Sequence, residues 1–299
     1  MRKIELLVPP EFEGAALKSF LRKHCGVSAG LLACLKREPG GLMRNHLPVI
    51  ATDLLHRGDR VVLSLSEEPV SAEAVELPFS VVYEDEDLLV ADKPPGMPMY
   101  PCPGHDRDSL ANGVAEYCRK TGETYAFRPV YRLDRDTTGL VVLAKNRYAA
   151  GKLAGRIQKT YLAVCMGALI GEGEIDAPIG LLEGHTIQRA VTPEGQTAVT
   201  HWKSLSSAVG AALLALTLET GRTHQIRVHL AHIGHPLFGD DLYGGTREFI
   251  GRQALHCSSA CFLHPVYGNP LSLHSPFPED MVRLMDFLGF PQNIFSDIL

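Results

Sequence analysis

The chain has 299 residues, of which 45% are hydrophobic, enough to bury a large core in one or two domains. No apolar run approaches the roughly 20 residues of a membrane span. The N-terminus, with Glu5 and Pro9-Pro10, does not resemble a signal peptide. The seven cysteines are an odd, scattered number, typical of thiols in a reducing compartment and not of a disulfide framework. We therefore expect a cytoplasmic protein without membrane spans.

The net charge of −5 is distributed unevenly along the chain. Residues 1–66 contain 10 Lys and Arg against 6 Asp and Glu, whereas residues 67–87 contain 8 acids and no Lys or Arg. Residues 88–299 are close to neutral, with 19 bases and 20 acids. One acidic stretch thus produces the negative total, and the composition permits an RNA-binding surface elsewhere.

The first 66 residues predict a small basic domain. Apolar spacing indicates a short amphipathic helix over 15–23, ended by Gly26, and Ser28 is a suitable N-cap for a second helix. A Gly-Asp pair then precedes an alternating strand over 60–65. This order resembles the alpha-L RNA-binding module, in a degenerate version because residues 36–41 replace its compact turn. The alternative is a helical cap with incidental basic residues.

Residues 67–80 lack hydrophobic periodicity and contain Pro69 and Pro78. This composition predicts an exposed acidic linker or edge segment. The chain is thereby divided into an N-terminal domain at 1–66, the linker, and a larger domain at 81–299.

The larger domain alternates strands and helices without a regular βαβ repeat. Such an order predicts an α+β fold with a mixed, largely antiparallel central sheet. The expected strands are 88–91, 140–144, 159–165, 198–205 and 211–220, and the expected helices are 109–119 and 147–157.

The most informative segment precedes the expected strand at 140–144. Residues 132–138 contain two arginines, two acids and two threonines. A polar turn at the mouth of a buried strand is a usual place for a reactive side chain on a rigid support. An ordinary solvated turn would use the same residue types, but here Arg132 and Asp134 would lie at the edge of an apolar layer. Asp134 is therefore a candidate nucleophile with a neighbouring cation.

The same segment resembles a known motif. Arg132-Leu133-Asp134 followed by Thr137-Thr138-Gly139 is similar to the catalytic motif of the RluA-type RNA pseudouridine synthases, usually written RLDxxTSG. The similarity runs from about 81 to about 285. Tyr131 stands where many relatives have His, and Thr138 replaces the commoner Ser, which leaves the Asp and Arg in place. Three further blocks match in the same order: Asp92-Lys93-Pro94-Pro95-Gly96-Met97-Pro98, Lys159-Thr160-Tyr161-Leu162-Ala163, and residues 220–230 with their continuation to Gly244.

The resemblance implies a pseudouridine synthase fold and the isomerisation of specific uridines in structured RNA. Asp134 matches the nucleophile, Arg227 the arginine that pairs with it, and Tyr161 the tyrosine that stacks on the target base and could relay the proton of carbon-5. Arg132 matches the residue that fills the space left by the flipped base. The other expected substrate-binding residues are Leu133, Lys93, His224 and Gln225.

The implied reaction requires no metal and no organic cofactor. The expected partner is ribosomal or transfer RNA, without a membrane and without an evident obligate protein partner. A non-catalytic RNA-binding protein that keeps the fold is the alternative of another class. Because Asp134 and Arg227 are both present, we expect activity.

Two other patterns point to different chemistry. Asp134-x-Asp136-x-Thr138 superficially matches the signature of haloacid-dehalogenase phosphotransferases, with Asp240-Asp241 as magnesium ligands. That chemistry needs an apolar strand before the first Asp, and here the strand follows. A zinc site could be drawn from His256, Cys257, Cys261 and His264, but the intervening apolar residues are typical of a core strand, where Cys is a common buried residue.

Overall fold

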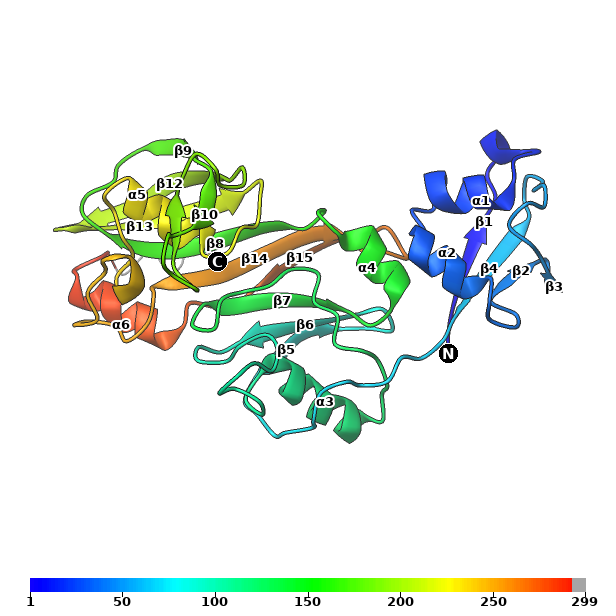
Figure 1. Cartoon of the computed structure of the whole chain (residues 1–299), viewed down its shortest axis with the longest axis horizontal. Helices are drawn as coiled ribbons and strands as arrows, with labels where there is room; N and C mark the ends of the chain where they lie inside the picture. Colours follow the sequence, from blue (N-terminus) through cyan, green and yellow to red (C-terminus); the bar gives the residue numbers. More distant parts are fainter. Residues whose placement is uncertain (292–299) are drawn as a thin grey trace.

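The computed structural model of the protein describes residues 1–291 (Figure 1). Within that range the chain forms a four-stranded sheet near the N-terminus, a nine-stranded sheet that runs through the rest of the molecule, and a two-stranded hairpin. None of the helices in residues 1–291 combines the length and the apolar character needed to cross a bilayer.

The N-terminal sheet is antiparallel, with the strand order β1-β4-β2-β3. The helix expected over 15–23 forms as one α turn, α1, which continues into a π-helical turn at Phe20–His24. The second expected helix, α2, is confirmed, and the Ser28 Oγ accepts a hydrogen bond from the backbone N of Leu31 at 3.1 Å. The elements are β1 (Arg2–Leu7), α1 (Leu17–Ser19), α2 (Ala29–Leu35), β2 (Leu42–Arg44), β3 (Leu47–Pro48) and β4 (Arg60–Leu65).

This N-terminal part encloses an apolar core of its own and is docked on the rest of the chain. Phe20 and Leu63 are completely buried in that core. Tyr148, on helix α4 (Arg147–Leu153), packs into the same core from the larger domain. Arg2 on β1 forms an ion pair at 2.8 Å with Asp87, whose side chain is fully buried. Shared packing and a buried ion pair therefore position this N-terminal part relative to the rest of the chain.

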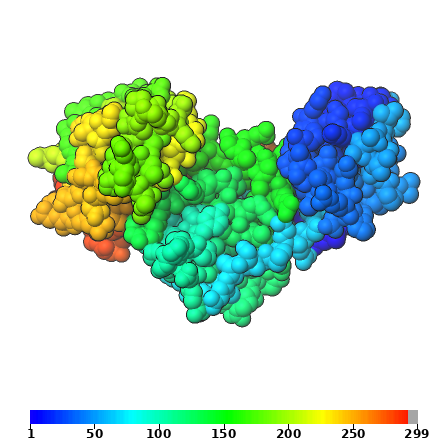
Figure 2. Space-filling view, in the orientation of Figure 1, coloured from blue at the N-terminus to red at the C-terminus, as the bar shows by residue number. Residues whose placement is uncertain are grey.

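Residues 66–79 contain no helix or strand, yet they are tied to the larger domain. Figure 2 shows this segment, in light blue to cyan, running along the body from the N-terminal domain. Each surface ion pair contributes little, but together they explain why the acidic segment follows this course. The acids pair with bases at 2.7 to 2.8 Å: Glu68 with Arg128 and Arg147, Glu73 with Arg107, and Glu76 with Lys120.

The large sheet has the strand order β5-β6-β7-β14-β8-β13-β12-β9, and β15 also pairs with β14. All of its strand pairs are antiparallel except β7 with β14, which confirms the expected mixed, largely antiparallel sheet. Its strands are β5 (Ser80–Glu84), β6 (Leu88–Lys93), β7 (Thr138–Ala144), β8 (Gln158–Met166), β9 (Glu172–Asp176), β12 (Val199–Ala208), β13 (Ala211–Leu218), β14 (Leu255–Leu263) and β15 (Pro270–His274).

Two halves of this sheet meet at a short junction. β7 and β14 pair through only two residues, Thr138 with His256 and Gly139 with Cys257, and β15 replaces β7 farther along β14. Gly139 has φ +107°, and a Cβ there would lie 2.2 Å from the carbonyl oxygen of Cys257. Only glycine fits this approach of two backbones. The segment before β7, which carries Asp134, therefore enters the fold where the two halves join.

Helices cover the sheet. Helix α3 (Leu110–Thr121) begins with a capping box formed by Ser109 and Asn112 and ends at Gly122 in the left-handed conformation. Helix α4 ends at Leu153, earlier than expected, because Gly155 has φ +68° and turns the chain toward β8. Two further helices were not expected from the sequence: α5 (Gln225–His232) and α6 (Glu279–Phe287).

Figure 2 shows the surface hollowed between the N-terminal domain and the lobe that carries β9, β12 and α5. The central part of the large sheet lies between these two masses in Figure 1.

Candidate active site

A pocket of about 400 Å³ lies where the two halves of the large sheet meet. Its walls come from the segment before β7, from the first half of β8 and from the segment between β13 and α5. Seven of the eight expected site residues line it: Arg132, Leu133, Asp134, Tyr161, His224, Gln225 and Arg227. The eighth, Lys93, does not.

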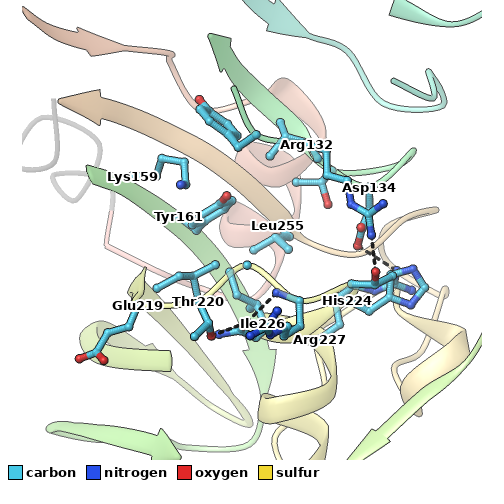
Figure 3. A pocket seen from close by; sticks show the side chains of 18 of the residues that line it. Arg132, Asp134, Lys159, Tyr161, Glu219, Thr220, His224, Ile226, Arg227 and Leu255 are labelled. Atoms are coloured by element: carbon cyan, nitrogen blue, oxygen red, sulfur yellow. Dashed lines mark hydrogen bonds and ion pairs between the residues drawn. The ribbon is translucent and has the colours of Figure 1, made fainter. Parts of the chain in front are cut away.

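The centre of the site is a row of three charges. Arg227 donates from Nη1 to Asp134 Oδ2 at 3.2 Å, and from Nε and Nη2 to the carboxylate of Asp240 at 2.7 and 2.8 Å (Figure 3). The Asp240 side chain is 1% exposed, whereas that of Asp134 is 24% exposed and faces the pocket. Arg227 thus neutralises a buried acid and holds an accessible one.

The electrostatics of Arg227 favour a permanent cation. Burial lowers the pKa of its guanidinium, but the hydrogen bonds and negative charges of Asp240 and Asp134 outweigh burial and leave the pKa raised. A bidentate pair with Asp240 also fixes the plane of the guanidinium. The remaining Nη1 is therefore aimed at one oxygen of Asp134, and the second carboxylate oxygen stays free for chemistry.

His224 and Tyr243 support this row. His224 precedes α5 with φ +58°, a left-handed conformation that is uncommon for a residue other than glycine. Its Nδ1 lies 2.8 Å from the Tyr243 hydroxyl, and the Tyr243 ring lies 5.0 Å from the Arg227 guanidinium. Burial lowers the pKa of His224, which favours the neutral imidazole at physiological pH.

Gln225 lines the pocket, but its amide is used within the protein. The Oε1 accepts from the backbone N of Arg222 and the hydroxyl of Thr220, both at 2.9 Å. The Nε2 donates to the Val199 carbonyl oxygen at 2.9 Å and to the Thr200 hydroxyl at 3.1 Å. Gln225 therefore ties the start of α5 to β12, and this network shapes the wall of the pocket.

Lys93 lies beneath the segment that carries Asp134 instead of in the pocket. Its side chain is fully buried, and its Nζ donates to the carbonyl oxygens of Pro94, Met97 and Arg135 at 2.9, 2.9 and 2.8 Å. Burial lowers the pKa of Lys93 to about 7, while the nearby carboxylate of Asp136 acts in the opposite direction. All three protons of the ammonium are directed at backbone, so the contact of Lys93 is with the loop of Asp134 and not with the pocket.

A second buried cation, Arg252, binds the same loop. Arg252 donates from Nη1 to the carbonyl oxygens of Asp136 and Leu255, both at 3.2 Å, and forms an ion pair with Asp280 on α6 at 2.7 Å. Lys93 thus binds the carbonyl oxygen of Arg135, and Arg252 binds that of Asp136. Such support limits the movement of the Asp134 carboxylate.

Tyr161 and Lys159 form the opposite wall on one face of β8. Figure 3 shows them across the pocket from Asp134, His224 and Arg227. Tyr161 is 5% exposed, and burial raises its phenol pKa well above the ordinary 10.0, with Cys257 and Asp134 adding to the effect. The Lys159 Nζ lies 4.5 Å from the centre of the Tyr131 ring, and burial lowers the pKa of this amine.

Arg132 and Leu133 lie side by side in the chain but in different environments. Arg132 is exposed and donates to the Thr223 hydroxyl across the mouth of the pocket. Leu133 is 6% exposed and belongs to the main hydrophobic core, so its side chain forms an apolar part of the wall. Arg132 thus places a positive charge at the rim, and Leu133 provides an apolar surface inside the pocket. This combination suits a ligand that has a flat uncharged ring and a negatively charged chain.

The sequence analysis missed the roles of Asp240, Tyr243 and Arg252. Asp240 and Tyr243 lie within the matching block after α5, but nothing in their spacing showed that they would meet Arg227. The only local signal was Gly239, whose φ of +76° and close approach to the Arg252 carbonyl oxygen require glycine at the turn before Asp240. These three residues act on Asp134 only through tertiary contacts.

The geometry does not fit the two rival sites. Arg227 lies between Asp134 and Asp240, so a cation already occupies the place that a magnesium ion would need. The four residues of the zinc alternative bond elsewhere: His256 to Thr138 and Ser275, Cys261 to Ser272, and His264 to Asp85, while Cys257 is buried. Among residues 1–291, the group of three or more ligands with metal spacing is Asp85, Asp87 and His264.

That group is also engaged by protein partners. Asp87 accepts from Arg2 and from Asn146, and Asp85 accepts from the Tyr83 hydroxyl and from backbone amides. It therefore belongs to the contact between the N-terminal domain and the catalytic body.

Comparisons with known proteins agree on one family. The sequence model of the RNA pseudouridylate synthase family matches residues 87–232. The chain is 42% identical to the uncharacterized RNA pseudouridine synthase YjbO of Bacillus subtilis, over 87% of this chain and 95% of that protein. It is 38% identical to the ribosomal large subunit pseudouridine synthase D of Salmonella typhimurium, over 77% of this chain and 76% of that protein.

A solved structure agrees with this assignment. Human RNA pseudouridylate synthase domain containing 1 matches with a TM-score of 0.55 and 25% identity, over 67% of this chain and 83% of that one. The sequence likeness spans most of the chain, and three of the four matching blocks contribute residues to the pocket of Asp134. The chain belongs to the RNA pseudouridine synthases, as a member similar to the ribosomal large subunit enzymes.

Proposed function

We propose that this synthase isomerises uridine in large-subunit ribosomal RNA in the cytoplasm, with Asp134 as the nucleophile. The observation that carries the assignment of Asp134 is its position: an accessible carboxylate, held by one arginine proton, at the edge of a pocket of about 400 Å³. Several relatives at 34 to 38% identity are named ribosomal large subunit pseudouridine synthase D, which supports ribosomal RNA as the substrate.

The target uridine would leave its stack and place its uracil in the pocket, at a cost of roughly a few kcal/mol. The bond between C1′ and N1 breaks, the uracil turns, and a bond forms between C1′ and carbon-5. The proton lost from carbon-5 is balanced by the proton gained at N1, so the reaction needs no oxidant or reductant. A carboxylate is suited to this work because it is ionised at neutral pH and can both attack and leave.

Arg227 would keep Asp134 aimed into the pocket through their ion pair at 3.2 Å. Leu133 and Tyr161 would face the plane of the uracil, and Arg132 would stand at the mouth, beside the RNA strand.

Replacing Tyr161 with Phe separates base stacking from proton transfer. The raised pKa keeps the phenol protonated at neutral pH, so a hydroxyl is available to pass a proton on. We expect RNA affinity within about threefold of the parent and turnover lower by roughly 10² to 10⁴, the usual worth of a positioned proton donor or acceptor. Tritium release from RNA labelled at carbon-5 measures turnover. A fully active Phe variant would leave the ring as a platform only.

We further propose that residues 1–66 dock the RNA. Lys18, Lys23, Lys36 and Arg37 are exposed on its helices and the turn after them. Replacing Lys36 and Arg37 together with Gln should weaken binding to ribosomal RNA and lower the salt slope by up to about one for each lost phosphate contact. Turnover of bound RNA should change by less than about threefold, because the pocket is untouched.

The matched control for this test removes two exposed arginines of the larger domain, Arg247 and Arg283. In that double Gln variant, the dependence of RNA affinity on salt concentration should have the same slope as in the parent. If both double variants shift the slope equally, the effect is one of total charge and the docking role fails.

The RNA target can be tested directly. Carbodiimide mapping of pseudouridines in RNA from cells with and without the protein should reveal at least one lost site in large-subunit ribosomal RNA. If pseudouridines are lost only from transfer RNA, then transfer RNA is the substrate and the proposal of ribosomal RNA is wrong. Restoring the gene, but not an Asp134→Asn copy, should restore the missing site.

A further inference from the structure

A second pocket, also of about 400 Å³, adjoins the active site. It lies between the loop before α5 and a hairpin formed by β10 (Ile179–Leu181) and β11 (Arg189–Val191). Arg132, Gly221, Arg222 and Thr223 line both pockets. The two spaces are therefore neighbours, with Arg132 at their common edge.

Three arginines converge on this pocket: Arg132, Arg189 and Arg222. None of the three takes part in an ion pair within residues 1–291, whereas Arg227, Arg252 and most other arginines of that range do. Three guanidinium groups that form no ion pair within residues 1–291 give this pocket a positive potential. Such a site fits an anion.

The hydrogen bonds of these arginines leave donors free. Arg132 uses one Nη2 bond to the Thr223 hydroxyl, and Arg222 uses its Nε for the Thr197 carbonyl oxygen at 3.0 Å. The Nε of Arg189 is buried without a hydrogen-bond partner. A buried unsatisfied donor is unfavourable, and an anion in the pocket would supply its acceptor.

One acid also lines the pocket. Glu194 is exposed, and its Oε2 accepts from the Thr192 hydroxyl at 2.5 Å. Solvent screens a charge in that position, so one exposed carboxylate opposes three guanidinium groups only weakly. The balance of the pocket stays positive.

The pocket is connected to the catalytic row through Tyr243. The backbone N of Arg189 donates to the Tyr243 hydroxyl at 3.0 Å, the same hydroxyl that lies 2.8 Å from His224 Nδ1. The Tyr243 ring in turn lies against the Arg227 guanidinium. The hairpin is thus positioned relative to Asp134 by a chain of direct contacts, as a substrate subsite requires.

We propose that this second pocket is a backbone-phosphate subsite, which holds the RNA strand next to the uridine whose base enters the first pocket. The inference rests on RNA being the substrate of the adjoining site. Arginine is suited to the role because its planar fork matches two oxygens of a phosphate. Because phosphate carries no sequence information, the subsite sets position and affinity and leaves the choice of uridine to other contacts.

Replacing Arg189 with Gln tests the proposal. Binding is measured with a short fluorescent oligouridylate over a range of salt concentrations, and turnover with large-subunit ribosomal RNA transcribed in vitro. We expect the Kd and the KM to rise about tenfold at low salt, the value of one charge-assisted hydrogen bond. The salt slope should fall by about 0.7, the contribution of one contact to a single strand. The kcat should fall by less than about threefold.

Three companions make the result decisive. Arg189→Lys keeps the charge and should recover most of the salt slope. Arg222→Gln, at an exposed position, should reproduce the effect if Arg189→Gln folds poorly. Arg283→Gln removes an exposed arginine on α6 and should leave Kd, KM and slope at the parent values.

Two outcomes overturn the subsite. Unchanged affinity and slope in both Gln variants would show that no phosphate binds there. A loss of kcat with unchanged Kd would assign the hairpin to the support of Tyr243 instead. If ribosomal RNA is not the substrate, the parent enzyme will show no turnover on it. The binding measurements with oligouridylate do not depend on that turnover and still test the subsite.

Discussion

Replacing Asp134 with Asn is expected to lower turnover by on the order of 10⁴-fold or more, with the fold and RNA affinity retained. The amide is nearly isosteric with the carboxylate but has no anionic oxygen with which to attack. The side chain is 24% exposed, so the change creates no cavity and buries no new group. Tritium release from labelled RNA measures the loss, and a filter-binding titration measures affinity.

The control for this variant is a measurement of its thermal stability. Arg227 keeps its bidentate pair with Asp240 when Asp134 becomes Asn, so the thermal unfolding midpoint should stay within about 2 °C of the parent. Turnover within tenfold of the parent would remove Asp134 from the role of nucleophile. A large fall in the unfolding midpoint would mean that the loss of turnover reports structure instead of chemistry.

Replacing Arg227 with Met is expected to have the largest effect on stability, a loss of about 3 to 5 kcal/mol in the free energy of unfolding. The change removes the cation between two acids and leaves Asp240, 1% exposed, as an unpaired buried charge. Turnover should also disappear, because Asp134 loses its partner. Denaturant unfolding measures the first effect and tritium release the second.

A second substitution separates the two effects of Arg227. In the double variant Arg227→Met/Asp240→Asn, no unpaired charge is buried, so much of the lost stability should return while turnover stays absent. The matched surface control is Arg247→Met, which breaks an exposed pair with Asp241 at 2.8 Å and should cost less than about 1 kcal/mol. If Arg227→Met were as stable as Arg247→Met, the buried row would not have the energetic role assigned to it.

The placement of Lys93 changes the role assigned to the loop at 92–98. The sequence analysis expected Lys93 to bind substrate, but its three donors are directed at carbonyl oxygens, one of them in the loop of Asp134. Together with Arg252, it fixes the backbone beside Asp134. Two buried cations from distant parts of the chain, Lys93 and Arg252, thus hold the backbone next to Asp134.

Local pattern predicted the elements whose signal lies within one segment. The apolar run of β7 is buried at every position, and the Ser28 cap and the alternation of β13 each needed only neighbouring residues. By contrast, α5 has no apolar stripe because nearly its whole surface is buried, including Arg227 and His229. The short outer strand β9 depends on β12, whose paired residues lie 23 to 31 positions later in the chain, so propensity alone could not reveal it.

The sequence by itself determined the chemistry: the motif around Asp134, the ordered blocks that follow it, and the α+β class were all readable from residue order. Only the tertiary structure decided which residues serve that chemistry. It brought Asp240 and Tyr243 to Arg227, moved Lys93 beneath the loop, and gathered three arginines around a second pocket. The physical reason is that Asp134 and Arg227, which are 93 positions apart in the sequence, become neighbours only when the two halves of the sheet join at Gly139.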